Sequence, residues 1–432
     1  MSAIEHIPEF SASVDNGLLR FMTCGSVDDG KSTLIGRLLY DTKAILADTL
    51  HAIERTSARR GLEAVDLSLL TDGLQAEREQ GITIDVAYRY FSTGTRKYIV
   101  ADAPGHEQYS RNMVTAASTA DLAIILVDAR KGVLAQTRRH SYIAHLLGVR
   151  HLVVAVSKMD LVGHSAERFE NIRKDYLAFA TEVGIGEVRF VPLSALNGDM
   201  IVDRGKQLGW YGGPTLLEIL ETAASAHHDI EEAFRFPVQY VCRPQRADDP
   251  ALHDYRGFMG RIESGQIRQG ENVIVLPSGR RSRIKDIQLA GRSLGTAVAE
   301  QSVTLLLEDE IDISRGDMLV KAAGGAPPML LRQFEAMLCW LAESPLDPAR
   351  KYVIRQTTRE ARAQVAQIDY RLDINSLRRL GAQSLEMNDI ARVGFRLSQP
   401  LALDSYASNR ATGAFIVIDE SSNDTVGAGV VL

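Results

Sequence analysis

Residues 25–32 read Gly-Ser-Val-Asp-Asp-Gly-Lys-Ser, a spacing of glycine, lysine and hydroxyl that suits a polyphosphate. Gly25 and Gly30 let the backbone turn tightly and point several N–H groups at one anion. Lys31 supplies a point charge for the terminal phosphates, and the Ser32 hydroxyl suits Mg²⁺. The predicted phosphate-binding residues are Gly25, Ser26, Val27, Asp28, Asp29, Gly30, Lys31, Ser32 and Thr33.

The flanking segments favour this interpretation. Residues 20–24, Arg-Phe-Met-Thr-Cys, predict a short buried strand, and residues 34–40 predict a helix. A helix that begins behind the loop points its positive end at the anion. Strand, loop and helix in this order are the context that the motif requires.

A second group of residues follows a predicted strand at 98–102, in the order Asp102-Ala103-Pro104-Gly105-His106. A carboxylate at a strand end can hold Mg²⁺, and Gly105 leaves room for its N–H to approach a γ-phosphate. His106 is placed to orient the attacking water. Upstream, Thr83 can offer its hydroxyl to Mg²⁺ and its N–H to the γ-phosphate. The predicted catalytic residues are His106, Lys31, Thr83 and Gly105, and the predicted metal ligands are Ser32, Thr83 and Asp102.

A third group predicts which base is bound. Ser157-Lys158-Met159-Asp160 follows a predicted strand at 151–156, and Ser194-Ala195-Leu196 follows one at 188–193. The Asp160 carboxylate can accept hydrogen bonds from N1–H and the 2-amino group of guanine, a donor pair that adenine lacks. The stem of Lys158 can lie along the base, and a backbone N–H of 194–196 can meet guanine O6. These residues predict GTP, with Mg²⁺, as the bound nucleotide.

Short apolar strands alternate with helices from residue 18 to 228, which predicts an α/β domain with a mostly parallel sheet. A further strand is expected at 122–127, and helices at 44–61 and 214–226. From about 234 the pattern changes to short, glycine-punctuated strands, which predict two small β-barrels. The expected organisation is a leader at 1–17, a GTP-binding domain at 18–228, and barrels at 234–324 and 328–432.

Composition argues against several classes of protein. The 49 basic residues against 55 acidic ones give a net charge of −6, which disfavours broad nucleic-acid binding. Residues 1–20 lack an apolar core, so no signal peptide is expected, and no run of 18 apolar residues predicts a membrane span. Three widely spaced cysteines are typical of free thiols in a reducing cytoplasm.

Taken together, these motifs resemble the translation-factor GTPases, such as elongation factor Tu, which also carry two β-barrels after the GTP-binding domain. The chain is more similar to the large, GTPase subunit of bacterial sulfate adenylyltransferase, of the CysN/NodQ type. That resemblance is carried by the runs at 25–41, 76–91, 103–113 and 409–419. Elongation factors usually carry His where Asp29 stands and Thr where Ser32 stands.

The narrower resemblance implies a function in sulfate assimilation. In that family ATP and sulfate give adenosine 5'-phosphosulfate and pyrophosphate, and the adenylyl transfer is assigned to a separate small, ATP-using subunit. This sequence contains no second nucleotide loop and no S-G-G-x-D-S string for pyrophosphate. The resemblance therefore implies that this chain hydrolyses GTP and drives adenylation on that partner.

This sequence departs from the family at one position of the base motif. The family usually has Asn where Ser157 stands, and we expect the shorter serine to tie this loop to the phosphate loop poorly or through water. Asp160 is kept, so guanine specificity is expected to survive. Some relatives continue into an adenylylsulfate kinase domain, which is not expected after the second barrel here.

Two alternatives stay open at the level of sequence. One is a translation factor that delivers aminoacyl-tRNA, and it predicts tRNA binding with a steep salt dependence. The other is a regulatory GTPase without an enzymatic partner.

Overall fold

The computed structural model describes residues 17–59, 65–70, 85–105, 110–149, 151–224, 230–244, 254–374 and 376–432. The chain forms two compact units, residues 1–225 and 226–432. Within the described ranges, no helix has both the length and the apolar character needed to cross a membrane.

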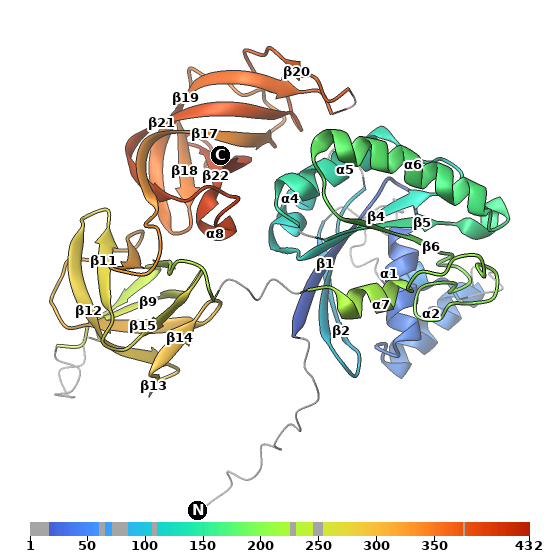
Figure 1. Ribbon diagram of the computed structural model, residues 1–432, viewed down its shortest axis with the longest axis horizontal. Coiled ribbons are helices and arrows are strands. Elements are labelled where there is room, and N and C mark those ends of the chain that lie inside the picture. The colour runs from blue at the N-terminus through green and yellow to red at the C-terminus, as the bar shows by residue number, and fades with distance from the viewer. Residues whose placement is uncertain are drawn as a thin grey trace, which may run out of the picture. The chain divides into compact units, whose positions relative to one another are not determined.

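The first unit is an α/β domain (Figure 1). Its elements are β1 (Leu18–Cys24), α1 (Lys31–Asp41), α2 (Ala47–Arg59), the 3₁₀ helix η1 (Leu67–Leu70), β2 (Ala87–Ser92), β3 (Lys97–Asp102), α4 (Ser110–Thr119), β4 (Leu122–Asp128), α5 (Ala135–Leu146), β5 (His151–Ser157), the 3₁₀ helix η3 (Met159–Val162), α6 (Ala166–Val183), β6 (Val188–Pro192) and α7 (Leu216–Thr222). The strands lie in the order β2-β3-β1-β4-β5-β6. All neighbours are parallel except β2, which runs antiparallel to β3.

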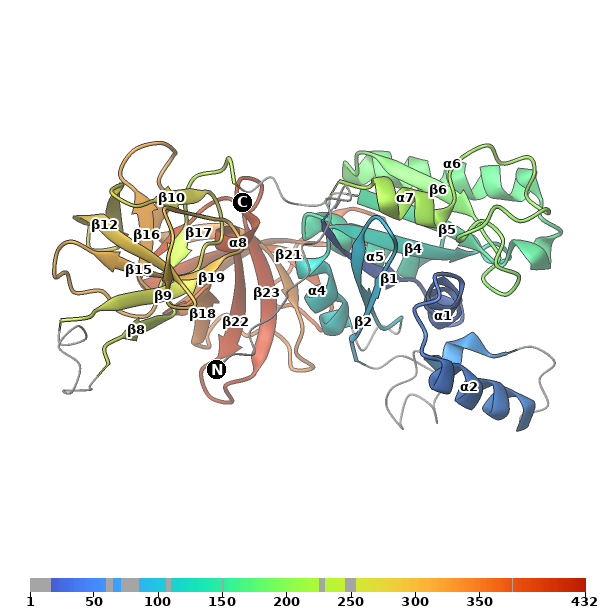
Figure 2. The ribbon, with the colours of Figure 1, turned by 90° about the horizontal axis from the view of Figure 1, so that it is seen from below.

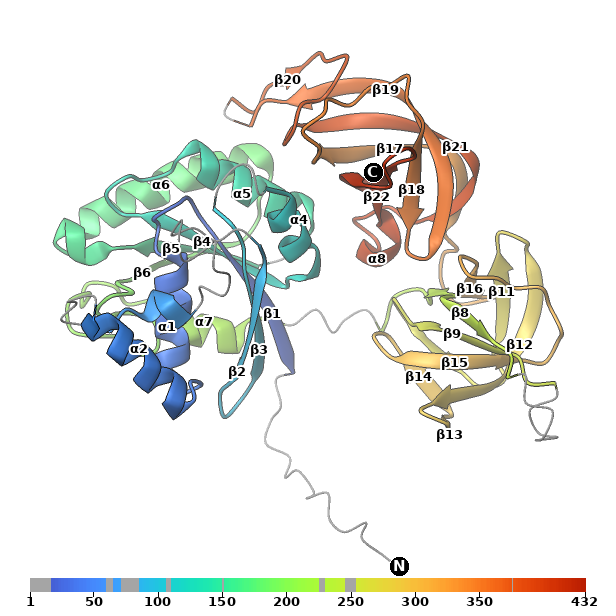
Figure 3. The same ribbon diagram turned by 180° about the vertical axis from the view of Figure 1, so that it is seen from behind.

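The five strands predicted from the sequence are confirmed as β1, β3, β4, β5 and β6, whereas β2 was not predicted. Helices α4, α5 and α6 cover one face of the sheet and α1 and α7 lie on the other (Figure 3). Because both faces are covered, the central strand β4 is buried at every residue and is apolar from residue 122 to 127. The edge strand β2 is largely exposed, and its sequence gives a weaker signal.

Helix α1 is the element that carries the predicted phosphate loop at its amino end. Helix α2 lies beside it (Figure 2), and η1 packs against α1 at Gly36. A Cβ on Gly36 would lie 2.1 Å from the carbonyl oxygen of Leu67, so only glycine permits this approach. The helix is thereby fixed between the sheet and η1.

The parallel strands of this unit end at the same edge of the sheet. The motifs at Asp102, Ser157 and Ser194 each follow such a strand, and the phosphate loop follows β1. In open α/β sheets the crevice outside the carboxyl ends of the strands is where ligands bind.

The second unit begins with a β-barrel. Its strands are β7 (Phe236–Pro237), β8 (Tyr240–Cys242), β9 (Gly257–Arg261), β10 (Gln266–Arg268), β11 (Asn272–Leu276), β12 (Arg280–Leu289), β13 (Arg292–Ser293), β14 (Thr296–Val298), β15 (Ser302–Leu307) and β16 (Met318–Lys321). The main sheet has the order β7-β16-β11-β12-β15-β9-β8. Strands β7 and β8 are two residues apart, so the single segment 236–242 pairs with both β16 and β9 and closes the ring.

The second barrel comprises β17 (Met329–Trp340), β18 (Tyr352–Gln356), β19 (Arg359–Leu372), β20 (Arg379–Leu380), β21 (Ile390–Leu403), the short helix α8 (Arg410–Gly413), β22 (Ala414–Asp419) and β23 (Thr425–Val431). Six strands close into a ring in the order β18-β22-β23-β17-β21-β19, with β19 returning to β18. The interior is filled by aromatic side chains, among them Phe334, Trp340 and Phe395. Inward and outward side chains alternate in β18 and along the first half of β19, as expected for a closed barrel.

A buried ion pair joins the two barrels within this unit. The Arg235 guanidinium donates two hydrogen bonds of 2.8 Å to the Asp404 carboxylate and a third, of 2.7 Å, to the carbonyl of Ala326. Nearby, Asn409 donates to the hydroxyl of Ser264 at 2.8 Å. Removing one partner of such a pair leaves a charge without its counterion, which is strongly destabilising.

Candidate functional site

The phosphate loop connects β1 to α1, as the sequence predicts. Gly30 precedes the first helical residue with φ 94°, in the left-handed region that favours glycine. Among the described residues no side chain caps the helix, so the N–H groups of its first turn have no acceptor from a cap there. Unsatisfied N–H groups together with the positive end of the helix dipole make this terminus an anion site.

Lys31 is buried at the first helical position. Its ammonium donates to the carbonyl oxygens of Gly25 and Ser26, both at 3.0 Å. Burial lowers the pKa of Lys31, and the nearby carboxylates of Asp102 and Asp29 oppose that shift. A buried ammonium held only by carbonyls among the described hydrogen bonds is available to a phosphate group.

Gly105 lies directly against this lysine. A Cβ on Gly105 would be 2.4 Å from the Lys31 ammonium and 2.6 Å from the carbonyl oxygen of Gly25. Only glycine therefore fits between the D-x-P-G turn and the phosphate loop. The role of Gly105 beside a terminal phosphate stays a prediction.

The carboxylate of Asp102 is buried at the end of β3, next to the phosphate loop. Thr23, its register partner on β1, donates its hydroxyl to Asp102 at 3.1 Å, and Ala103 donates its N–H to the Thr23 carbonyl. Asp102 and the Ser32 hydroxyl are hard oxygen donors, which suits Mg²⁺. Pro104 follows Ala103 in the turn. Two further predicted residues lie outside the described part of the chain, the metal ligand Thr83 and the catalytic His106.

Asp29 is a buried acid inside the phosphate loop. One of its oxygens accepts the N–H of Ser26 at 2.6 Å, and the other has no hydrogen-bond partner among the described residues. Burial raises the pKa of Asp29 to about 6, although Lys31 and the Ser26 N–H oppose the shift. The sequence places Asp29 in the phosphate loop, and no pattern in the sequence indicates that its carboxylate is buried.

The base motif is tied directly to the phosphate loop. The hydroxyl of Ser157 donates to the carbonyl of Asp29 at 2.7 Å, and both groups are buried. The expectation of a poor or water-mediated tie was wrong, because the two loops approach closely enough for a serine to span them. The Lys158 ammonium also donates to the carbonyl of Asp28 and lies 3.2 Å from the Asp128 carboxylate.

Asp128, at the end of β4, is a residue that the sequence reasoning missed. Burial alone would raise its pKa, but hydrogen bonds from Arg130 and Lys158 hold the pKa of Asp128 well below its usual value. The Arg130 guanidinium donates two hydrogen bonds to the Asp128 carboxylate, of 3.0 and 2.6 Å. The sequence signal that was available is a carboxylate at the end of a central strand. Asp128 positions Lys158 beside the phosphate loop.

The two base-recognition segments lie together. The hydroxyl of Ser194 donates to one oxygen of the Asp160 carboxylate at 2.6 Å, and Met159 donates its N–H to the carbonyl of Leu193. The Asp160 carboxylate is thus oriented, and both of its oxygens keep acceptor capacity for a base. The structure also adds Arg37 of α1, which donates to the carbonyls of Ala195 and Leu196 at 3.1 and 2.5 Å.

Helix α5 contacts the D-x-P-G turn through Gln136, whose amide donates to the carbonyl of Gly105 at 3.4 Å. The same amide lies 2.9 Å from a ring nitrogen of the buried His140. Burial lowers the pKa of His140 to about 3, and Lys31 and Arg139 add to the shift, so the ring is neutral. Neither residue was predicted, because a glutamine and a histidine in an ordinary helix carry no distinguishing pattern.

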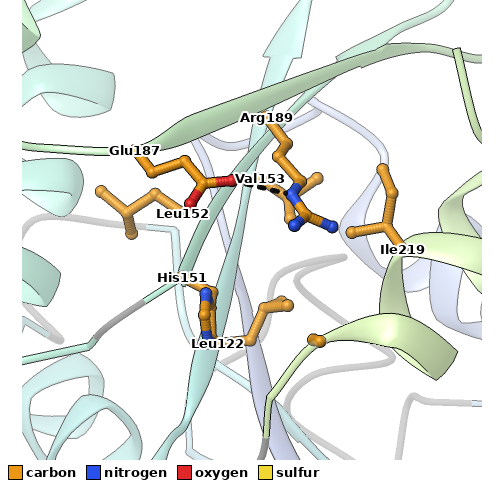
Figure 4. A pocket seen from close by; sticks show the side chains of 8 residues that line it. Leu122, His151, Leu152, Val153, Glu187, Arg189 and Ile219 are labelled. Atoms are coloured by element: carbon orange, nitrogen blue, oxygen red, sulfur yellow. Dashed lines mark hydrogen bonds and ion pairs between the residues drawn. The ribbon is translucent and has the colours of Figure 1, made fainter.

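A small hollow opens elsewhere in this unit (Figure 4). It lies at the amino ends of β4 and β5, lined by Leu122, His151 and Ile219 with the Glu187–Arg189 ion pair beside them. The phosphate loop and the base motifs follow the carboxyl ends of the strands instead. This hollow is therefore not part of the nucleotide site.

Comparisons with known proteins agree with this geometry. Residues 16–226 match the elongation factor Tu GTP binding domain, and residues 333–432 match the GTP-eEF1A C-terminal domain-like family. Sulfate adenylyltransferase subunit 1 of Cellvibrio japonicus is 54% identical over 417 residues, which cover 96% of this chain and 86% of that protein. The same subunit of Alteromonas mediterranea is 52% identical, with 96% and 87% covered.

A third relative is the bifunctional enzyme NodQ of Rhizobium sp. (strain N33), 52% identical over 98% of this chain and 64% of that protein. Identities above 50% along nearly the full chain include both the GTP-binding domain and the β domains. The chain therefore belongs to the family of sulfate adenylyltransferase subunit 1, with an elongation factor Tu type GTP-binding domain.

Proposed function

We propose that this chain is the GTP-hydrolysing subunit of a sulfate adenylyltransferase, which makes adenosine 5'-phosphosulfate and pyrophosphate from ATP and sulfate. The observation that carries the proposal is the identity to subunit 1 proteins over 96% of the chain. The convergence of the phosphate loop, Asp102 turn and base motifs in one unit supports it.

Guanine recognition is assigned to the base motifs. The Asp160 carboxylate, oriented by the Ser194 hydroxyl, accepts hydrogen bonds from N1–H and the 2-amino group, one at each oxygen, and a backbone N–H of residues 194–196 meets O6. Adenine presents no such donor pair to the carboxylate, so ATP is disfavoured at this site. The Lys158 stem, held between Asp28 and Asp128, lies along the base.

Triphosphate recognition is assigned to Lys31 and Gly105. Lys31 exchanges its carbonyl partners for phosphate oxygens, and the Gly105 N–H binds the γ-phosphate. Loss of that phosphate frees the turn, which gives GTP and GDP forms that differ in shape. Ser32, Asp102 and Thr83 would hold Mg²⁺, which neutralises phosphate charge when bound. His106 orients the attacking water.

The partner is a small, ATP-using subunit that carries out the adenylyl transfer. Sulfate is a weak nucleophile and its mixed anhydride with AMP is unstable, so the transfer needs a coupled source of free energy. A GTP-dependent switch can supply it only by binding two states of the partner with different affinity. The proposed organisation is a heteromeric enzyme in the cytoplasm without nucleic-acid ligands.

The test is sulfate-dependent pyrophosphate release by this chain mixed with the small subunit. Release should rise with GTP, stay low with a non-hydrolysable GTP analogue, and fall to the low level in Lys31→Ala. Pyrophosphate release that ignores GTP would overturn the coupling. Tight tRNA binding with a steep salt dependence would instead favour a translation factor.

A further inference from the structure

Arg37 connects the helix that carries the phosphate loop to the loop that meets the base. It lies in the second turn of α1, six residues after Lys31, and its side chain is 20% exposed. Its guanidinium donates the Nε–H to the carbonyl of Ala195 at 3.1 Å and an Nη2–H to the carbonyl of Leu196 at 2.5 Å. Nη1 lies 3.5 Å from the Asp41 carboxylate.

These two bonds fix the orientation of two successive peptide planes. In a trans peptide the carbonyl and the following N–H point to opposite sides. Because the Ala195 carbonyl points at Arg37, the N–H of Leu196 points away from it. Neither Ala195 nor Leu196 donates its N–H to a partner in the described part of the chain. A fixed, unpaired N–H is the kind of donor that a guanine O6 requires.

The second peptide plane, between Leu196 and Asn197, is linked through Ser194 to the Asp160 carboxylate. With the Leu196 carbonyl held by Arg37, the N–H of Asn197 donates to the hydroxyl of Ser194 at 3.3 Å. A hydroxyl that accepts this bond has its own proton free, and Ser194 donates it to Asp160 at 2.6 Å. Arg37 therefore acts on both base contacts through the backbone of one loop.

We propose that Arg37 is a positioning residue for guanine recognition, which holds the loop 194–197 so that the Leu196 N–H faces O6 and Ser194 keeps Asp160 in place. The inference rests on the proposed binding of GTP at this site. It deepens that function, because one helix then sets both the phosphate contacts at its amino end and the base contacts two turns later. A planar fork suits this task, since it reaches two carbonyls at once.

The test compares GTP with the triphosphate of 2-aminopurine riboside, which keeps the 2-amino group but lacks both O6 and the N1–H donor. Arg37→Met should weaken GTP binding by about tenfold, the worth of one well-placed hydrogen bond, and weaken the analogue by about threefold or less. The rate of hydrolysis at saturating GTP should stay unchanged. The loss of GTP affinity in Arg37→Lys should lie between that of Arg37→Met and no loss, because an ammonium lacks the planar pair of donors with which a guanidinium reaches both carbonyls.

The matched control is Arg168 of α6, which also donates Nε and Nη2 to two successive carbonyls, those of Ala129 and Arg130. Arg168→Met should leave the ratio of GTP to analogue affinity unchanged. Equal losses for both nucleotides in Arg37→Met and Arg37→Lys, or no loss for either, would overturn the proposal. Binding of neither nucleotide by the unaltered chain would instead refute the proposed function, and the inference with it.

Discussion

Replacement of Ser157 by alanine probes the bond that ties the base motif to the phosphate loop. The Oγ–O distance is 2.7 Å and Ser157 is 1% exposed. Loss of a buried hydrogen bond that leaves its acceptor unsatisfied costs about 1–3 kcal/mol. The Asp29 carbonyl stays buried after the substitution, so this range applies. The cost falls partly on folding and partly on nucleotide binding, since the bond also orders the loop that the phosphates contact.

We therefore expect Ser157→Ala to lose about 1–2 kcal/mol of unfolding free energy and to bind GTP about three- to tenfold more weakly. The preference for GTP over ATP should persist, because the bond between Ser194 and Asp160 is independent of Ser157. Calorimetric titration with GTP, GDP and ATP measures the affinities, and chemical denaturation measures the stability.

The control is Ser141→Ala, which removes another buried serine whose hydroxyl donates to the carbonyl of Thr137 at 2.8 Å and accepts a bond from the hydroxyl of Tyr176 at 2.7 Å. This variant should lose stability and keep its GTP affinity, because the partners of Ser141, Thr137 and Tyr176, belong to neither the phosphate loop nor the base motifs. The reasoning on Ser157 is refuted if Ser157→Ala leaves both quantities unchanged. It is also refuted if the variant loses its guanine preference while its stability is retained.

Four further predictions follow from the site and the second unit. Asp160→Asn should weaken GTP binding and favour xanthosine triphosphate, because an amide no longer matches the guanine donor pair; an unchanged ranking in a competition assay would contradict the role. His106→Ala should slow GTP hydrolysis by about 10²–10⁴ and spare GTP binding; equal losses in the two measurements would refute it. Asp29 has a pKa raised from 3.8 to about 6 by burial, so its stabilising protonated form is lost as pH rises through 6. The unfolding free energy of the parent should therefore fall by at most about 3 kcal/mol between about pH 4 and pH 7, and Asp29→Asn should not show this fall. An Asp29→Asn variant with the same pH profile as the parent would contradict the prediction. Arg235→Met leaves the Asp404 carboxylate buried without its guanidinium and should destabilise the second unit by about 3–5 kcal/mol in denaturant unfolding; a loss below 1 kcal/mol would mean that water replaces the arginine.

The phosphate loop and the strands around it could be predicted because their signals are local. Glycine spacing, a lysine and an apolar run before them lie within 13 residues, and each maps onto a turn or strand of its own. The edge strand β2 was missed because its residues are half exposed and carry no apolar run. Barrel closure through 236–242 was equally hidden, since it depends on which strands that segment meets.

The contacts that the sequence missed join residues far apart in the chain. Arg37 and Ala195 are 158 positions apart, and Ser157 meets Asp29 across 128. A pattern predicts residue types at a site but not the distance between two loops, which is why Ser157 was judged too short. The predicted roles of Thr83 and His106 stay predictions, because both residues lie outside the described part of the chain.

Calorimetric titration of the purified chain with nucleotide and Mg²⁺ tests the central claim most directly. Saturable heat with GTP, none with ATP, and a strong loss in Lys31→Ala are expected if residues 25–32 and Asp160 together bind one guanine nucleotide. Equal heats for GTP and ATP, or no heat with GTP, would contradict the assignment of this edge of the sheet as a guanine nucleotide site.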